Sequence, residues 1–450
     1  MLTQKQPPSA ELDAPALQAL AENFSGQIIL PDDPDYDLGR LVWNGMIDRY
    51  PAIILQPAQT SDVAAAVNFA REQGLPLAVR GGGHNVAGLG SVDRGIVVDL
   101  ARMNQVAVDP AARRVKVGGG ARLGEMDQAA QAYGLVVPAG VVSDTGVAGL
   151  TLSGGFGWLS SKFGLTCDNL VGAEVVTADG RVVYASEQEN ADLLWGLRGG
   201  GGNFGIVTRF EFQAYPLGPE IMLAFVFHDG ENMFEAVKFF RDFMASAPDE
   251  VSGIAFAGMF PPGAEAFPEH VHGKRFIAFG AMYAGSAEEG ERVLAPLREF
   301  APPLVDFSGQ MPYLQAQTMF DEDYPKYEMR YYWKSLNLLE LNDEVIARYV
   351  EHARRQPSPY NTTDLWPIKG KARADSQQTG AFAGRHAAYL LNPEANWIEP
   401  EDDEANIQWV REFVEEMGEF SDGSRYLNFA GFLEEGREER LIKNLPLVVL

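Results

Sequence analysis

The segment Arg80-Gly81-Gly82-Gly83-His84-Asn85 constrains the fold of this 450-residue chain more than any other part of it. Three consecutive glycines leave their backbone N–H groups bare and can adopt positive φ, so the loop can wrap closely round an anion such as a pyrophosphate. The apolar run 77–79 predicts a buried strand that delivers the loop. Taken alone, the hexapeptide is more typical of a tight turn followed by a histidine whose hydrogen bonds are satisfied. No Gly-Lys-Ser/Thr follows, so it is not a P-loop.

Two further glycine-rich stretches, 140–157 and 199–205, bracket Cys167, the single cysteine of the chain. The first stretch can follow a ligand closely, and its backbone N–H groups and hydroxyl side chains are suited to phosphate groups. The second satisfies G-x-G-x-x-G at Gly200, Gly202 and Gly205. A predicted helix precedes this motif and a predicted strand follows it, which is the reverse of the dinucleotide-binding fingerprint. We therefore reject a Rossmann interpretation.

The Arg-Gly-Gly-Gly-His loop and the segment Gly164-Leu165-Thr166-Cys167-Asp168-Asn169-Leu170 together resemble the berberine-bridge-enzyme-like FAD-linked oxidoreductases. These proteins have the vanillyl-alcohol-oxidase (PCMH) type of flavin-binding fold, and the resemblance covers about residues 25–435. It implies FAD held by two covalent bonds, from His84 to the 8α-methyl carbon and from Cys167 to carbon 6 of the flavin. Without the resemblance, a lone cysteine is more often a small buried apolar residue.

The same resemblance implies a set of cofactor-binding residues in the glycine-rich stretches and the strand after them. They are Arg80, Gly81, Gly82, Gly83, His84, Asn85, Gly88, Ser143, Gly146, Gly149, Ser153, Gly154, Gly157, Cys167, Gly205, Ile206 and Val207. The segment Tyr426-Leu427-Asn428-Phe429 matches the family's Tyr-x-Asn-Tyr-type motif. Tyr426 is thus expected to take the substrate's proton, with Asn428 orienting Tyr426 or the substrate, although a core-packed tyrosine is an equal alternative. No histidine shows metal-ligand spacing, so no metal is predicted.

The length of the chain predicts two domains or one large composite domain. We expect an α+β fold with a two-part PCMH-type FAD-binding domain at 25–215. A substrate domain at 216–410 would follow, built as an antiparallel sheet backed by helices, and 411–450 would return to the flavin domain. Within the first domain, 96–100, 105–108 and 114–117 are predicted to be strands of one small sheet. The end of the chain, 440–450, is apolar and lacks the family's Asp-Pro-x-Asn-Phe-type closing motif.

The charge of the chain narrows the classes of partner. With 36 Lys and Arg against 62 Asp and Glu, the net charge is −26, which argues against binding to nucleic acid or an anionic membrane surface. Residues 1–24 show no signal-peptide pattern, and no apolar run is long enough to cross a bilayer, so the cytoplasm is the expected location. A single cysteine excludes an intrachain disulfide.

The resemblance implies oxidation of a small molecule by hydride transfer to flavin N5. The expected substrates are alcohols, sugars or secondary metabolites oxidised at a CH–OH group, or less often at a C–N bond. The reduced flavin would pass its electrons to molecular oxygen, giving hydrogen peroxide, or to another acceptor. Two alternatives stay open, an oxidative ring-closing or tailoring enzyme and a flavin-binding protein without efficient turnover.

Overall fold

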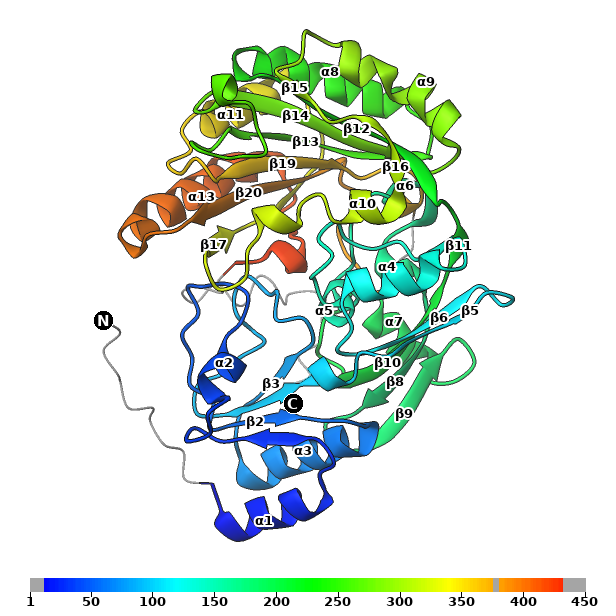
Figure 1. Ribbon diagram of the computed structural model, residues 1–450, viewed down its shortest axis with the longest axis vertical. Coiled ribbons are helices and arrows are strands. Elements are labelled where there is room, and N and C mark those ends of the chain that lie inside the picture. Colours follow the sequence, from blue (N-terminus) through cyan, green and yellow to red (C-terminus); the bar gives the residue numbers. More distant parts are fainter. Residues whose placement is uncertain (1–11, 375–379, 432–450) are drawn as a thin grey trace.

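The structure, a computed structural model, describes residues 12–374 and 380–431, and shows two layered parts stacked on one another (Figure 1). The lower part is built from the first half of the chain and the upper part from most of the second half. Helices and antiparallel strands are mixed in both, so the predicted α+β class is confirmed. Residues 432–450, which include the unusual apolar ending, lie outside the described residues.

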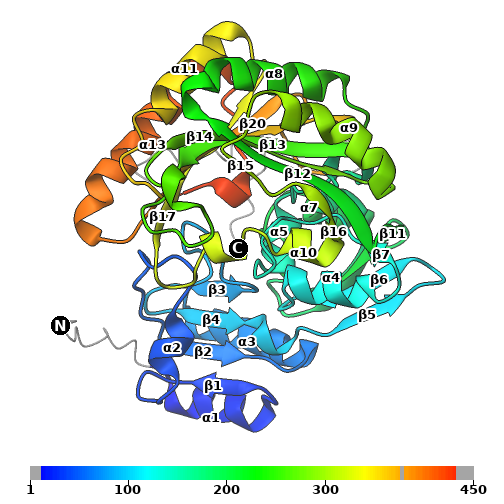
Figure 2. The ribbon, with the colours of Figure 1, turned by 45° about the horizontal axis from the view of Figure 1, so that its top comes forward.

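The first sheet of the lower part is four-stranded and mostly parallel. Its order is β1 (Gln27–Ile29), β2 (Ile53–Gln56), β4 (Ile96–Asp99) and β3 (Leu77–Arg80), with β4 parallel to both neighbours and β1 antiparallel to β2. Figure 2 shows these strands in turn, with helix α1 (Ala14–Asn23) beyond β1. Helix α3 (Thr60–Gln73) buries an apolar stripe in the same core and ends at Gly74, whose left-handed conformation (φ 63°) favours glycine.

The second sheet is five-stranded and antiparallel. Its order is β5 (Val106–Asp109), β6 (Arg114–Gly118), β10 (Ile206–Gln213), β8 (Leu170–Val176) and β9 (Val182–Ser186). The prediction that 96–100 joins 105–108 and 114–117 in one sheet is therefore wrong. All four residues of β4 are buried, as in a central strand of a covered parallel sheet, whereas β5 alternates half-buried and exposed residues and pairs with β6 as a hairpin.

Short elements connect these sheets. They are α2 (Tyr36–Arg40), α4 (Leu123–Gln131), α5 (Val147–Leu152), α6 (Ser160–Phe163), α7 (Ala191–Leu197), and the paired strands β7 (Leu135–Val136) and β11 (Tyr215–Pro216).

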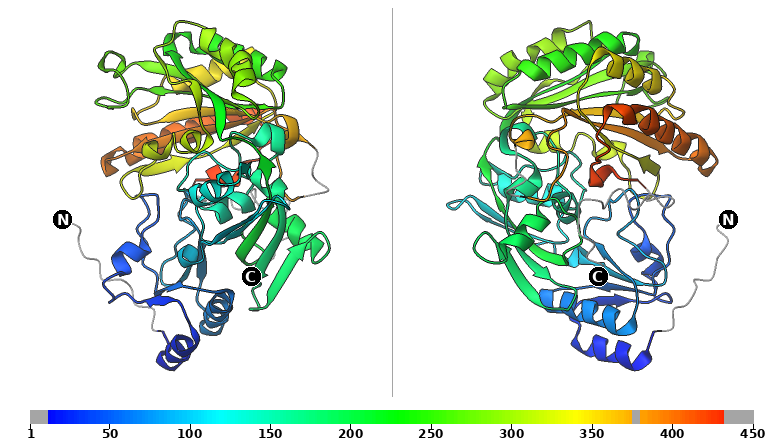
Figure 3. Two further views of the ribbon diagram at one scale, coloured as in Figure 1. Left: turned by 45° about the vertical axis from the view of Figure 1, so that its right-hand side comes forward. Right: turned by 180° about the vertical axis from the view of Figure 1, so that it is seen from behind.

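The upper part is one large antiparallel sheet. Its order is β15 (Val305–Asp306), β12 (Glu220–Asp229), β14 (Arg275–Tyr283), β13 (Val251–Met259), β19 (Thr362–Pro367), β20 (Tyr389–Trp397) and β17 (Arg330–Trp333). Strand β16 (Gly309–Pro312) also pairs with β12, and β18 (Leu336–Leu338) with β20. Four helices cover its outer face, α8 (Met233–Ser246), α9 (Ala287–Glu299), α11 (Asp343–Ala353) and α13 (Asp403–Met417) (Figure 3).

Strand alternation gives this sheet two different faces. On β12, Ala224 and Val226 pack in the cluster under the helices, while Phe225 and Phe227 belong to a second cluster on the opposite face. That second face looks toward the lower part of the molecule, and helix α10 (Tyr313–Gln317) lies between them (Figure 1). The chain returns to this region after α13, a helix that spans the expected boundary at residue 410.

One buried contact between the two parts carries an uncompensated acid. The Asp127 side chain on α4 is 1% exposed, and its Oδ2 accepts a hydrogen bond from Gln317 Nε2 on α10 at 2.9 Å. Its Oδ1 has no partner among the described residues. Burial raises the pKa of Asp127 to about 7 although the Gln317 hydrogen bond opposes the rise.

We expect Asp127→Asn to stabilise the protein in a pH-dependent way. Because the pKa is higher in the folded state, the unfolded state loses this proton first, and stability falls as the pH rises from about 4 to about 7. A neutral amide avoids that loss. The free energy of unfolding of the variant should therefore exceed that of the wild type by on the order of 2 kcal/mol at pH 8 and by less at pH 5. Urea unfolding at the two pH values measures the difference. An equal effect at both would show that Asp127 titrates normally.

Candidate active site

A cavity of about 1260 Å³ lies between the lower part and the inner face of the large sheet. This exceeds the roughly 300–1,000 Å³ of a typical pocket for one small ligand. Its floor consists of the loop after β3, the stretch around α5 and the start of β10, and its roof of β12, β13, β19 and β20. It therefore has room for a large cofactor below and a substrate above.

Arg80 anchors the glycine loop at the end of β3. The Arg80 side chain is 7% exposed and forms an ion pair with Asp99 on the adjacent strand, Nη2 to Oδ2, at 3.0 Å. Its guanidinium also donates to the carbonyl oxygens of Gly39 and Leu41. Because these partners occupy the guanidinium, Arg80 acts on the cavity by holding the loop in place.

Two glycines allow the loops of the cavity floor to touch. A Cβ atom at Gly82 would lie 2.3 Å from the backbone nitrogen of Gly146, and a Cβ at Gly146 would lie 2.3 Å from that of Gly82. Arg122 Nη1 joins the same loops by donating to the carbonyl oxygens of Gly82 and Asp144, both at 2.6 Å. The glycines therefore bring the segment carrying His84 against the segment carrying Asp144.

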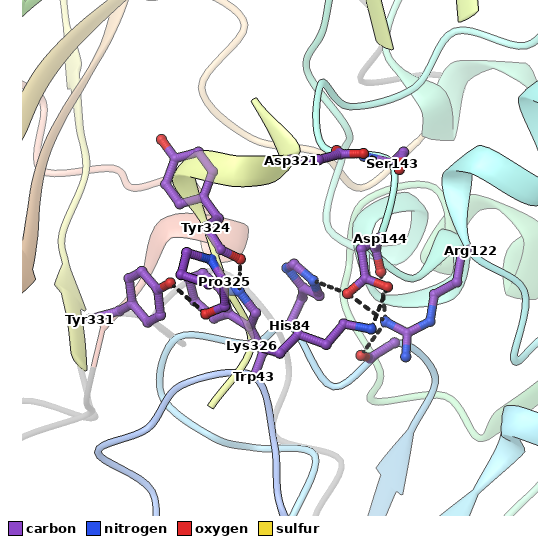
Figure 4. A network of polar contacts seen from close by, with 11 residues as sticks. Trp43, His84, Arg122, Ser143, Asp144, Asp321, Tyr324, Pro325, Lys326 and Tyr331 are labelled. Carbon is purple, nitrogen blue, oxygen red and sulfur yellow. Dashed lines mark hydrogen bonds and ion pairs between the residues drawn. The ribbon is translucent and has the colours of Figure 1, made fainter. Parts of the chain in front are cut away.

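His84 and Asp144 form the centre of a polar network (Figure 4). His84 Nε2 lies 2.9 Å from Asp144 Oδ2, and the imidazole stacks on the Trp43 ring at 4.9 Å between centroids. Asp144 also pairs with Lys326 at 2.6 Å and with Arg122 at 3.5 Å. Burial alone would raise the pKa of Asp144, but the hydrogen bonds from His84 and Lys326 and the charge of Arg122 lower it to about 2.

This network favours one form of the His84 ring. Burial lowers the pKa of His84 and outweighs the opposite effect of Asp144, so the imidazole is neutral at physiological pH. The carboxylate of Asp144 accepts a hydrogen bond, so the ring proton lies on Nε2 and the lone pair is on Nδ1. We find no hydrogen bond to Nδ1 within 12–374 and 380–431, so this nitrogen is available as a nucleophile.

Tyr426 and Asn428 reach the same cavity from the returning C-terminal segment. The Tyr426 hydroxyl oxygen accepts hydrogen bonds from the backbone N–H of Gly155 (2.9 Å) and of Phe156 (3.3 Å) and from Asn428 Nδ2 (2.8 Å). Burial raises the pKa of Tyr426 to about 12, although these three donors favour the phenolate. A hydroxyl surrounded by donors is arranged to stabilise negative charge on its oxygen.

The cavity brings together most of the residues expected from the sequence. Arg80, Gly81, Gly82, Gly83, His84, Asn85, Gly146, Gly149, Ser153, Gly205, Ile206, Val207, Tyr426 and Asn428 line it. Gly88, Ser143, Gly154, Gly157 and Cys167 are not among its lining residues. Gly154 and Gly157 lie behind the floor, where the Cβ of a larger residue at 154 would touch Phe382 and Tyr426. Ser143 donates its hydroxyl to Asp321.

Cys167 lies beneath the floor of the cavity. Its side chain is fully buried in the apolar cluster that holds Phe156 and Leu165, and its backbone N–H donates to Gly154 O at 2.9 Å. Burial raises the pKa of the Cys167 thiol, and the charge of the neighbouring Asp168 adds to the rise. The environment therefore favours the thiol over the thiolate that attack on a flavin requires.

Several residues of the site were missed from the sequence. Asp144 is the single carboxylate in 140–157, and its isolation among small and apolar residues is a signal that could have found it. No comparable local signal marks Lys326, Asp364 or Glu394. Only the fold brings Lys326 to Asp144 and the two acids to the cavity.

Comparison with known proteins assigns the family. Residues 51–186 match the family model described as an FAD-binding domain. An FAD-linked oxidoreductase of Dictyostelium discoideum is 30% identical over 353 residues, which cover 78% of this chain and 74% of that protein. The chain therefore belongs to the FAD-linked oxidoreductases, and the predicted resemblance to their berberine-bridge-enzyme-like members is confirmed.

Two solved structures show how far the likeness extends. The structure of 6-hydroxy-D-nicotine oxidase from Arthrobacter nicotinovorans matches with a TM-score of 0.79 and 25% identity, covering 93% of this chain and 91% of that one. Glucooligosaccharide oxidase from Acremonium strictum, which carries a 6-S-cysteinyl, 8α-N1-histidyl FAD, matches with a TM-score of 0.79 and 26% identity, covering 92% of this chain and 90% of that one.

Across 12–374 and 380–431, no helix has the length and apolar character needed to cross a membrane.

Proposed function

We propose that this chain carries FAD covalently bound to His84 and oxidises a small molecule at a C–H bond next to oxygen or nitrogen. Bound FAD supplies a hydride acceptor. The observation that carries the proposal is that the glycine loop with His84 and the residue Tyr426 line one cavity, whose roof is the large sheet. In this arrangement residues 25–215 hold the flavin and 216–410 shape the substrate pocket.

The floor of the cavity fits the cofactor. Gly82 and Gly146 let the two loops approach closely and both line the floor, and glycine-rich loops of this kind can present backbone N–H groups to phosphates. His84 Nδ1 is the nitrogen that would bond to the flavin, because Asp144 occupies Nε2. Asp144 is thus a positioning residue, which sets the tautomer of His84 and is itself held by Arg122 and Lys326.

We propose a single attachment rather than the two expected from the sequence. His84 lines the cavity, whereas Cys167 is not among its lining residues, and burial raises the pKa of its thiol. Tyr426 remains the proposed acceptor of the substrate's proton, with Asn428 orienting it, and oxygen or another acceptor would take up the electrons that bound FAD receives.

Acid precipitation of the purified protein tests the attachment. We expect the yellow colour to stay in the pellet for the wild type and for Cys167→Ala, and to pass into the supernatant for His84→Ala. Colour retained by His84→Ala but lost by the double variant would instead show that both residues bind the flavin. A wild-type protein that carries no flavin would contradict the proposed function itself.

A further inference from the structure

The roof of the cavity contains a pair of buried acids. Strand alternation points Asp364 on β19 and Glu394 on β20 to the cavity, and the two side chains are 6% and 3% exposed. Asp364 lies opposite Asn392 and Glu394 lies opposite Thr362, so the two acids are diagonal neighbours across adjacent strands. Buried acids are rare unless a cation or a metal balances them.

Nothing in the described part of the chain supplies that balance. No lysine, arginine or histidine nitrogen there lies within 4.0 Å of either carboxyl group. Glu394 accepts hydrogen bonds from the Tyr324 hydroxyl at 2.8 Å and Asn392 Nδ2 at 2.6 Å, and its carboxyl group also shares a hydrogen bond with that of Asp364. Burial raises the pKa of Asp364, and burial together with the charge of Asp364 raises that of Glu394. A cation placed between the two carboxyl groups would offset the free-energy cost of burying their negative charge.

The charges of the rest of the cavity favour a cation as well. Arg80 is the only lysine or arginine among the described lining residues, and Asp99 already neutralises it. Further carboxylates line the cavity besides the pair, namely Glu265, Glu322, Asp323 and Glu328. A cavity with low-dielectric walls and one sign of charge concentrates ligands of the opposite sign.

The surfaces around the pair are aromatic. Phe225, Phe227, Phe256 and Phe276 form the adjoining roof, which provides no hydrogen bonds for the many hydroxyl groups of a sugar. Closer to the pair, Tyr324, Trp333 and Trp366 line the cavity, and aromatic faces attract cations.

The surface beside the pair of acids contains a hydrogen-bond donor that no described residue satisfies. Trp366 lies two residues beyond Asp364 on the same strand face, and its side chain is 7% exposed. Its indole Nε1 has no hydrogen-bond partner among the described residues. A buried N–H without a partner is costly, so it points to a ligand that reaches this place.

We propose that the substrate is an apolar amine, bound as its ammonium ion between Asp364 and Glu394 with its hydrocarbon part against the phenylalanine-lined roof. This inference rests on the proposed function, since it specifies the substrate class for the same cavity. An alcohol or a sugar of the same size would leave the pair uncompensated. An ammonium nitrogen has no lone pair to support the loss of a hydride, so the pair would first accept one proton from it. The C–H bond next to that nitrogen, rather than one in a CH–OH group, would then be the bond oxidised.

A matched pair of ligands tests the inference without requiring turnover. Phenethylamine is a cation at neutral pH and phenethyl alcohol is its neutral counterpart of similar shape. The flavin content of the purified holoenzyme is measured first, and the dissociation constants of both ligands are then measured by equilibrium dialysis. We expect the amine to bind at least about tenfold more tightly, the size of a charged hydrogen bond in a buried site.

The double variant Asp364→Asn/Glu394→Gln should lose this preference and keep its affinity for the alcohol, which also shows that the cavity is intact. Glu235→Gln, an exposed acid on α8 outside the cavity, is the matched control and should keep the preference. Equal affinities of the wild type for both ligands would overturn the inference whether or not the variant folds, and so would a preference that survives in the variant. Because dialysis does not depend on colour, a protein without flavin would contradict only the proposed function.

Discussion

Gly82→Ala is expected to abolish flavin incorporation and to destabilise the protein. The added methyl group would lie 2.3 Å from the backbone nitrogen and 2.5 Å from the Cα of Gly146. Neither atom belongs to a flexible side chain, so the two loops must separate. Overpacking of this kind costs about 3 kcal/mol at the upper end of its usual range. Separation also pulls His84 away from Asp144, because the two loops carry these residues.

The visible absorbance of the purified variant, relative to its protein absorbance, measures flavin incorporation, and thermal unfolding measures stability. Gly309→Ala is the matched control, because its Cβ would meet no atom within 4 Å and the residue lies on β16, outside the cavity lining. A Gly82→Ala protein with the flavin content of the wild type would show that the close approach of the loops is not needed for binding.

Tyr426→Phe is expected to slow substrate-driven reduction of the flavin by about 10²–10⁴-fold, the usual contribution of a positioned acid or base. The variant removes the hydroxyl that Gly155, Phe156 and Asn428 surround and leaves the ring in place. Anaerobic bleaching of the flavin in a stopped-flow spectrometer measures the rate. An alcohol or amine that bleaches the wild type serves as substrate, with phenethylamine tried first.

Tyr349→Phe separates the chemical role of Tyr426 from the mere loss of a buried hydrogen bond. The Tyr349 hydroxyl donates to Thr363 O at 2.7 Å, and the residue packs under the helices on the outer face of the large sheet. This control should keep the wild-type bleaching rate. An unchanged rate in Tyr426→Phe would remove Tyr426 as the base and direct attention to Glu394 and Tyr324. Failure of every alcohol and amine to bleach the wild type would favour a flavin-binding protein without turnover.

Local sequence was sufficient for the features that depend on neighbouring residues. The glycine loop after β3, the hairpin of β8 and β9 at Asp179-Gly180 and the helix end at Gly74 follow from backbone preferences of a few residues. The antiparallel upper sheet was also predictable, because its strands are long and apolar and its helices have clear buried stripes. The flavin-binding family could be recognised from two short segments.

The chain by itself thus determined the parts of the site, and the tertiary structure decided which parts meet. Lys326 reaches Asp144 from 182 positions along the chain, counted as 326 − 144, and Asp364 and Glu394 become neighbours only through the register of β19 with β20. Cys167, whose bond to the flavin stays a prediction, is fully buried and is not among the residues that line the cavity. The physical reason is that backbone preferences act over a few residues, whereas burial, ion pairing and pKa depend on the packing of segments that are remote in sequence.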